Sequence, residues 1–122
     1  MRPEIVERIQ ELIDAITDFK NRSIKVYISI SRARDIGHDR HFSTETCFRL
    51  TVNYFGITMS GAQIFLEQDE TTCLGISADA IADFTVKDNN AITIIEHFEE
   101  KTERRITIIP ITNDQEPKTK NS

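Results

Sequence analysis

The chain has 122 residues, a formal net charge of −5 and 39% hydrophobic residues, a composition typical of one folded domain rather than a disordered segment. Its acidic balance makes binding to a nucleic-acid backbone unexpected, because such binding needs a basic surface. We expect no membrane helix and no secretory signal, since the apolar runs are short and acidic residues follow the first methionine closely. The expected location is therefore the cytoplasm.

Residues 3–20 are predicted to form one amphipathic helix. Apolar side chains recur there at the spacing of a single buried stripe, namely Ile5, Val6, Ile9, Leu12, Ile13, Ile16 and Phe19. Pro3 suits the first helical turn, where its missing N–H would have no partner. Asn21 can adopt the left-handed conformation that ends a helix.

After Asn21 the hydrophobic period changes from 3.6 to two, which predicts β-strands. We expect six or seven of them, at residues 23–31, 46–54, 62–67, 71–77, 81–87, 91–98 and 104–112. Residues 32–45 are interpreted as a polar loop. The alternation changes phase at Gly56, which predicts a bulge or a sharp bend there. Pro110 cannot donate a ladder hydrogen bond, which favours an edge position for the last strand.

The pattern predicts an α+β fold, mainly antiparallel β, with one N-terminal helix. We expect a single domain over residues 1–112, formed by the helix at 3–20 and a β-rich part at 23–112, and a disordered tail at 113–122. The last hairpin carries isoleucines on both faces. Such a hairpin is typical either of a closed small barrel plugged by the helix, or of a homodimer or higher oligomer that continues the sheet or buries its second face.

Residue types that support catalysis do not come together in the sequence. His38, His41 and Cys47 are the nearest approach to a metal set, but no second close pair completes four ligands. Cys47 and Cys73 are interpreted as free thiols packed like small apolar residues. The acidic runs, including the one from Glu96 to Glu103, are interpreted as solvated faces of turns. We therefore expect no enzyme, no metal and no cofactor.

Arginines and exposed aromatic side chains are better candidates for a binding site. The arginines form two groups, Arg32, Arg34 and Arg40 in the loop and Arg104 and Arg105 at the start of the last strand. Arginine can hold a phosphate through two parallel hydrogen bonds. Tyr27 and Phe55 lie opposite the core parity of their strands and could stack on a base. The alternative is a rim of arginines paired with Asp35, Asp39 and Glu103.

The order of elements resembles a small viral anti-defence family, the nucleotide-signal sponges that counter Thoeris immunity. The segments that carry the likeness are Ala82-Asp83-Phe84, Lys87-Asp88-Asn89-Asn90 and Arg104-Arg105. The resemblance implies a dimer that sequesters a cyclic ADP-ribose signal without cleaving it, in the host cell cytoplasm if the protein is viral. It also implies that Phe84 stacks on the ligand, that Asn90 hydrogen-bonds it and that Arg105 meets a phosphate.

With this resemblance, the expected function is that of a non-catalytic protein that sequesters a small cyclic ADP-ribose-type nucleotide to counter host immunity. The expected ligand-binding residues are Phe84, Asn90, Arg105, Arg104, Arg34 and Arg32. Two alternatives stay open. One is a small protein-interaction inhibitor of the phage or mobile-element type. The other is an Sm-like RNA-binding barrel, to which residues 76–86 are similar.

Overall fold

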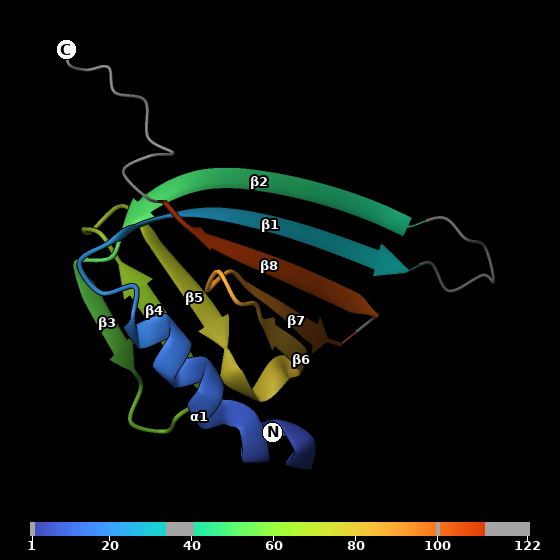
Figure 1. Ribbon diagram of the computed structural model, residues 1–122. Helices are drawn as coiled ribbons and strands as arrows, with labels where there is room; N and C mark the ends of the chain where they lie inside the picture. Colours follow the sequence, from blue (N-terminus) through green and yellow to red (C-terminus); the bar gives the residue numbers. More distant parts are fainter. Residues whose placement is uncertain (1, 34–40, 100, 112–122) are drawn as a thin grey trace.

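The computed structural model describes residues 2–33, 41–99 and 101–111 (Figure 1). These residues form one α-helix, α1 (Pro3–Thr17), one short 3-10 helix, η1 (Ala78–Ala80), and eight strands. The strands are β1 (Ser23–Ala33), β2 (His41–Thr51), β3 (Tyr54–Ile57), β4 (Gln63–Glu67), β5 (Cys73–Ser77), β6 (Ile81–Val86), β7 (Ile92–Phe98) and β8 (Thr102–Pro110).

The strands form two antiparallel sheets. The larger sheet has the order β2-β1-β8-β7-β6, and the smaller has the order β3-β4-β5. The apolar residues that alternate along the strands face inward and form one core with the buried side of α1, which packs against β6. This arrangement confirms the α+β class with an N-terminal helix. The number of strands exceeds the six or seven expected by one or two.

The helix ends at Thr17, three residues earlier than predicted. The Thr17 hydroxyl donates to the carbonyl of Ile13 at 2.7 Å, and tight turns carry the chain onward from residue 18. Phe19 is fully buried within these turns, so its apolar character reflects the core and not a further helical turn. Asn21 has a φ of 66°, which confirms the predicted left-handed position.

The two ends of the segment predicted as a polar loop, 32–45, are paired strand, and residues 34–40 lie outside the described residues. β1 continues to Ala33 and β2 begins at His41, in continuous antiparallel register. Hydrophobic alternation could not reveal these ends of the two strands, because both of their faces are exposed. Ile30 and Thr44 are exposed on one face, and Glu45 is exposed on the other. Backbone pairing alone extends the strands beyond the core.

Of the two alternatives for the change of phase near Gly56, a bulge or a sharp bend, the structure shows no bulge at Gly56, which pairs in regular register with Phe65. The chain instead changes sheet just before it. β2 ends at Thr51 in the larger sheet, and β3 begins at Tyr54 in the smaller one. The chain crosses between the sheets at Asn53, whose N–H donates to the carbonyl of Glu67 at 2.9 Å. One predicted strand over residues 46–54 is therefore two.

Replacement of Gly56 by alanine is expected to destabilise the protein by about 1–3 kcal/mol. An added Cβ would lie 2.7 Å from Cε2 of Phe65, on the neighbouring strand β4, so the ring would have to move. Gly75→Ala is the matched control, because no heavy atom lies within 4 Å of its added Cβ. Urea unfolding would compare the two variants, and equal losses at both sites would contradict this account.

Pro110 does not mark an edge strand. β8 lies between β1 and β7 in the interior of the larger sheet. Pro110 is tolerated because it is the last residue of β8, and the next ladder bond comes from the N–H of Ile111 to the carbonyl of Ser23 at 3.0 Å. A missing donor at the end of a strand interrupts little of the ladder.

Candidate functional site

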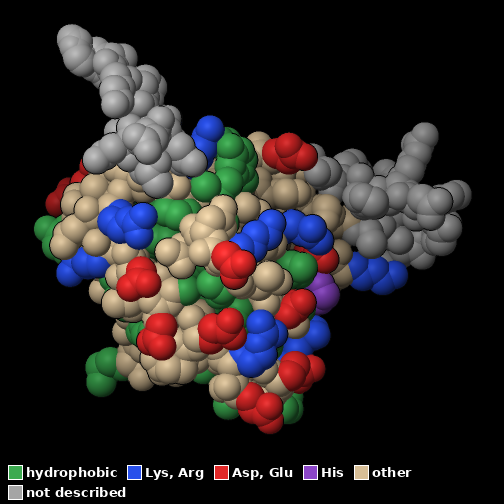
Figure 2. Space-filling view, in the orientation of Figure 1, with side chains coloured by type: hydrophobic (Ala, Val, Ile, Leu, Met, Phe, Trp, Pro, Cys, Tyr) green, Lys and Arg blue, Asp and Glu red, His purple; other side chains and the backbone are tan. Residues whose placement is uncertain are grey.

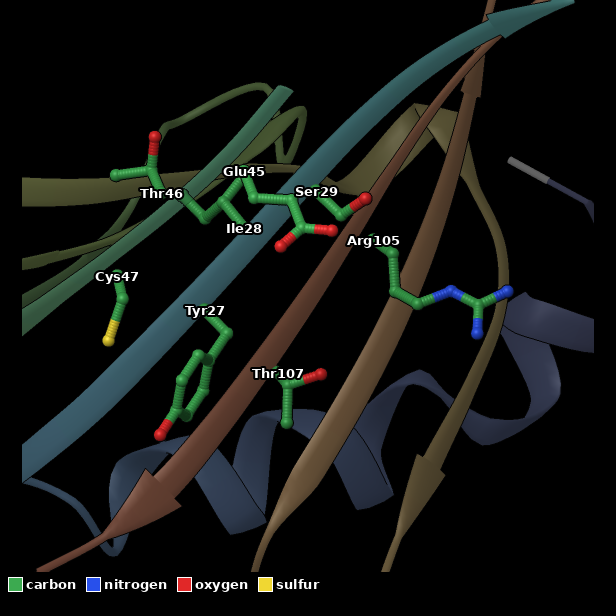
Figure 3. A pocket seen from close by; sticks show the side chains of 8 residues that line it. All are labelled: Tyr27, Ile28, Ser29, Glu45, Thr46, Cys47, Arg105 and Thr107. Carbon is green, nitrogen blue, oxygen red and sulfur yellow. The ribbon is translucent and has the colours of Figure 1, made fainter. Parts of the chain in front are cut away.

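A groove on the outer face of the larger sheet is the best candidate for a binding site (Figure 3). We call it the sheet groove. Its volume is about 380 Å³, within the range of small-molecule sites. It is lined by Tyr27, Ile28, Ser29, Glu45, Thr46, Cys47, Arg105 and Thr107, which come from β1, β2 and β8.

Strand register explains why these side chains meet. Ile24 and Val26 of β1 face the core, so the alternate residues Tyr27 and Ser29 face outward. Tyr27 lies opposite Cys47 of β2 on one side and Thr107 of β8 on the other. Ser29 lies in the same way between Glu45 and Arg105. Two adjacent rows of cross-strand neighbours therefore supply six of the eight lining residues. The other two, Ile28 and Thr46, form the cross-strand pair between these rows.

The groove combines an exposed ring, a guanidinium group and several hydroxyl groups. The Tyr27 side chain is exposed, and the ammonium nitrogen of Lys25 lies 5.5 Å from its ring centroid. Arg105 is also exposed, and its Nη2 lies 3.5 Å from a carboxylate oxygen of Glu103. An exposed pair of this kind is weak, so an anionic ligand could replace Glu103 at little cost. Figure 3 shows the Glu45 carboxylate beside Ser29, which places one negative charge in the same groove.

Phe84, which the resemblance makes a stacking residue, belongs to the core. Its side chain is 2% exposed. The guanidinium carbon of Arg8 lies 4.3 Å from its ring centroid, and Nη2 of Arg8 donates to the Phe84 carbonyl at 2.9 Å. A ligand could stack on the covered face of this ring only after displacing the Arg8 side chain. This burial argues against the expected stacking role of Phe84, which stays a prediction.

Asn90 lies in the tight turn between β6 and β7. Its φ is 66° and its N–H donates to the carbonyl of Lys87 at 2.9 Å. Asparagine tolerates this left-handed conformation better than most residues, so the turn itself accounts for the residue. The turn does not line the sheet groove, and the structure does not bring Asn90 together with Arg105.

Arg104 and Arg105 point to opposite faces of the larger sheet, because neighbouring residues of a strand alternate. Arg104 faces inward and forms an ion pair with Glu96, which is fully buried. Two further backbone bonds complete the cluster: the Ser77 N–H donates to Glu96 at 2.6 Å, and Arg104 donates to the Gly75 carbonyl at 2.8 Å. Arg104 is therefore structural, and Glu96 is not the solvated turn residue that was expected.

The remaining predicted residues lie apart from the groove or outside the described chain. Arg32 is exposed near the distal end of β1, opposite Thr102. Arg34 and Arg40 lie outside the described residues. Phe55 is half-buried and packs against the core, so of the two aromatic candidates only Tyr27 is available as an outward ring.

Both cysteines are exposed free thiols, which corrects the prediction that they pack like small apolar residues. Cys47 lines the sheet groove, and Cys73 lies at the start of β5. His38 and the side chain of His41 lie outside the described residues. Within the described ranges, no group of three or more possible metal ligands comes together.

A second, more open hollow of about 750 Å³ lies at one end of the smaller sheet. Its lining includes three acidic residues and consists of Tyr54, Glu67, Gln68, Asp69, Glu70, Thr71 and Cys73. Asp69 accepts hydrogen bonds from the N–H of Thr71 at 2.9 Å, from its hydroxyl at 2.8 Å and from the N–H of Thr72 at 3.0 Å. These bonds close the turn between β4 and β5.

The same bonds hold the pKa of Asp69 below its ordinary value, and those from Thr71 have the largest effect. A carboxyl group whose pKa is lower in the folded state than in the unfolded state stabilises the fold at pH values above its ordinary pKa. This stabilisation is lost as the pH falls through the pKa of the folded state. Asp69→Asn should therefore reduce the loss of stability on acidification below about pH 4. Urea midpoints between pH 3 and pH 7 would measure this, with the neighbouring variant Glu70→Gln as control. If the urea midpoint of Asp69→Asn fell with pH as steeply as that of the unmodified chain, this expectation would be contradicted.

The comparisons with known proteins bear on the fold alone. No protein-family model matches the sequence. No curated protein matches it either. The crystal structure of the Bacillus subtilis YojF protein is similar, with a TM-score of 0.58 over 84% of this chain and 92% of that one, at 13% sequence identity. No helix in the described part of the chain is long and apolar enough to span a membrane.

Proposed function

We propose that this chain is a non-catalytic binding protein that sequesters a small anionic nucleotide in the sheet groove. The observation that carries the proposal is the exposed Tyr27 ring on the same outer face as the Arg105 guanidinium, in a groove of about 380 Å³. A ring and a guanidinium group within one small groove suit a ligand that has both a base and a phosphate.

Each part of the groove has a role in this proposal. Arg105 would exchange its weak contact with Glu103 for a bidentate bond to phosphate. Tyr27 would stack on the base, and Ser29 and Thr107 would hydrogen-bond the sugar. The lining residues include no histidine, so Cys47 has no imidazole base beside it in the groove. Binding without turnover fits such a set better than nucleophilic catalysis.

Charge supports a small ligand over a long polyanion. On the face shown in Figure 2, Lys and Arg side chains lie among Asp and Glu side chains rather than in one basic field. A single phosphate group responds to the local potential at Arg105, whereas a nucleic acid needs a continuous basic track. This mixture of charges favours a mononucleotide or cyclic nucleotide.

The more specific ligand follows from the resemblance and not from the groove. Cyclic ADP-ribose isomers are the first ligands to test, and the biological role would be to remove a host immune signal. Isothermal titration calorimetry should give saturable heat, and heating the complex should release the ligand intact. A cleaved ligand, or no heat with any isomer, would overturn this assignment. Retention of one stoichiometric protein from a lysate, with no nucleotide bound, would favour the inhibitor alternative instead.

Arg105→Ala is expected to weaken binding of the anionic ligand about tenfold or more, because a charged hydrogen-bond partner is lost. Its effect on stability should stay within about 0.5 kcal/mol, since the side chain is exposed. Lys87→Ala is the matched control, because it removes one exposed positive charge outside the groove. Calorimetry on both variants would measure the difference, and equal affinities would contradict the placement of the site.

A further inference from the structure

The two outer strands of the larger sheet differ in how their free edges are protected. At β6, the Phe84 carbonyl accepts from Arg8 at 2.9 Å, and the Phe84 N–H donates to the Asp83 carboxylate at 2.9 Å. α1 also packs against this strand. β6 is therefore closed to a further strand. At the opposite margin of the sheet, β2 has no neighbouring described strand on its outer side (Figure 1).

Hydrogen bonding shows which groups of β2 point outward. The N–H of Thr51 points away from β1, because it donates to the Gln68 side chain at 2.8 Å. Backbone groups alternate along a strand, so the N–H and C=O groups of Arg49, Cys47 and Glu45 point the same way. Within the described chain, these three residues have no backbone partner on that side. Gln68 caps the edge at Thr51 and leaves the segment 45–49 open.

The side chains along this open segment complement each other in an antiparallel arrangement. Glu45 and Arg49 are exposed on the outer face, on either side of Cys47. Neither has an ion-pair partner among the described residues. If Cys47 lay opposite its own copy, each Glu45 would lie opposite an Arg49, on both sides of the two-fold axis.

We propose that two copies of this chain pair through their β2 edges, antiparallel, with Cys47 on the two-fold axis. The backbone groups of residues 45, 47 and 49 would form the new ladder, and two Glu45–Arg49 pairs would flank its centre. The larger sheet would then run continuously through both copies. The occupant of the edge is a second copy, because the charges of the segment are complementary to themselves in this register.

Other registers are worse on charge. A pairing centred on Glu45 would place two carboxylates opposite each other, and one centred on Arg49 would place two guanidinium groups opposite each other. Centring on Arg49 would also set Cys47 against Thr51, whose outward N–H is already bonded to Gln68. The register centred on Cys47 is the one that sets each glutamate against an arginine.

The dimer would change the sheet groove. Glu45 lines the groove and repels an anion there, and Arg49 of the second copy would neutralise it. The groove of each copy would thus gain a cation from the other, and the two grooves would lie on one continuous face. This consequence rests on the proposed function, whereas the dimer itself does not.

Sedimentation equilibrium without any ligand tests the dimer. The unmodified chain should dimerise, and Glu45→Arg should weaken dimerisation at least tenfold because like charges would then face each other. The exchange variant Glu45→Arg/Arg49→Glu should restore dimerisation, because an arginine at position 45 would again lie opposite a glutamate at position 49. A monomer at all concentrations, or a dimer that these substitutions leave unchanged, would overturn the proposal.

Cross-linking tests the register. In a Cys73→Ser background Cys47 is the one remaining cysteine, and the proposed pairing sets the two Cα atoms about 5.5 Å apart. A short bismaleimide should then give a covalent dimer, which the Glu45→Arg variant should lose and the exchange variant should regain. Dimerisation without this cross-link would overturn the register. Because neither assay contains nucleotide, failure to bind a ligand would leave these outcomes untouched.

Discussion

Replacement of Glu96 by alanine is expected to destabilise the protein by about 3 kcal/mol, the lower end of the range for breaking a buried ion pair. Glu96 is fully buried, and its carboxylate accepts bonds from Arg104 and from the Ser77 N–H. Its removal leaves both donors unsatisfied in the interior. We expect the lower end of this range because the Arg104 side chain is 23% exposed, so water can partly solvate it once Glu96 is removed.

Urea unfolding would measure the loss, with Glu99→Ala as the control, since Glu99 is exposed just beyond β7. The double variant Glu96→Leu/Arg104→Met should recover part of the stability, because the unpaired charge is gone from the interior. A loss below about 1 kcal/mol in Glu96→Ala would show that the ion pair is dispensable. If the double variant loses more unfolding free energy than its two single variants lose together, apolar replacement cannot compensate for the ion pair.

Replacement of Phe84 by alanine is expected to cost about 3–5 kcal/mol, as for other buried phenylalanines. The ring is 2% exposed and lies within the core, beneath the guanidinium group of Arg8. Truncation leaves a cavity between β6 and α1 and removes the cation–π contact. The loss would identify Phe84 as a core residue.

Phe84→Leu separates the structural role from a ligand-stacking role. It keeps most of the apolar volume, so the protein should remain folded with a smaller loss of stability. If the sheet groove is the site, its affinity for the nucleotide should stay that of the unmodified chain, whereas Tyr27→Ala should lower it. A selective loss of affinity in Phe84→Leu would return the site to the position that the resemblance implies.

Strands that have one buried face could be predicted from the sequence, because burial imposes a period of two. Tyr27 is predicted to lie opposite the core parity of its strand, and the structure confirms this, since Ile24 and Val26 are buried and Tyr27 is exposed. The distal hairpin could not be predicted in the same way, since residues such as Thr44 and Glu45 are exposed on opposite faces. Where neither face is buried, pairing leaves no hydrophobic pattern.

The site was predicted in part, and the error follows from the same periodicity. Arg104 and Arg105 were grouped because they are adjacent, although adjacent strand residues face opposite sides. Glu96 shares the parity of Ile92 and Ile94, a signal for an inward position, but it was grouped with the acidic residues of the following turn and interpreted as solvated. Its partner could not be identified from one strand, because the register that sets Glu96 opposite Arg104 arises only when β7 and β8 pair.

The bond from the Ser77 N–H to Glu96 ties the outer edge of β5 to a side chain of the larger sheet. That amide cannot exchange with solvent deuterium unless the two sheets separate or the carboxylate leaves its partner. The smaller sheet should therefore open together with β7 and β8 rather than before them. We therefore expect the three short strands β3, β4 and β5 to unfold as one cooperative unit with the larger sheet.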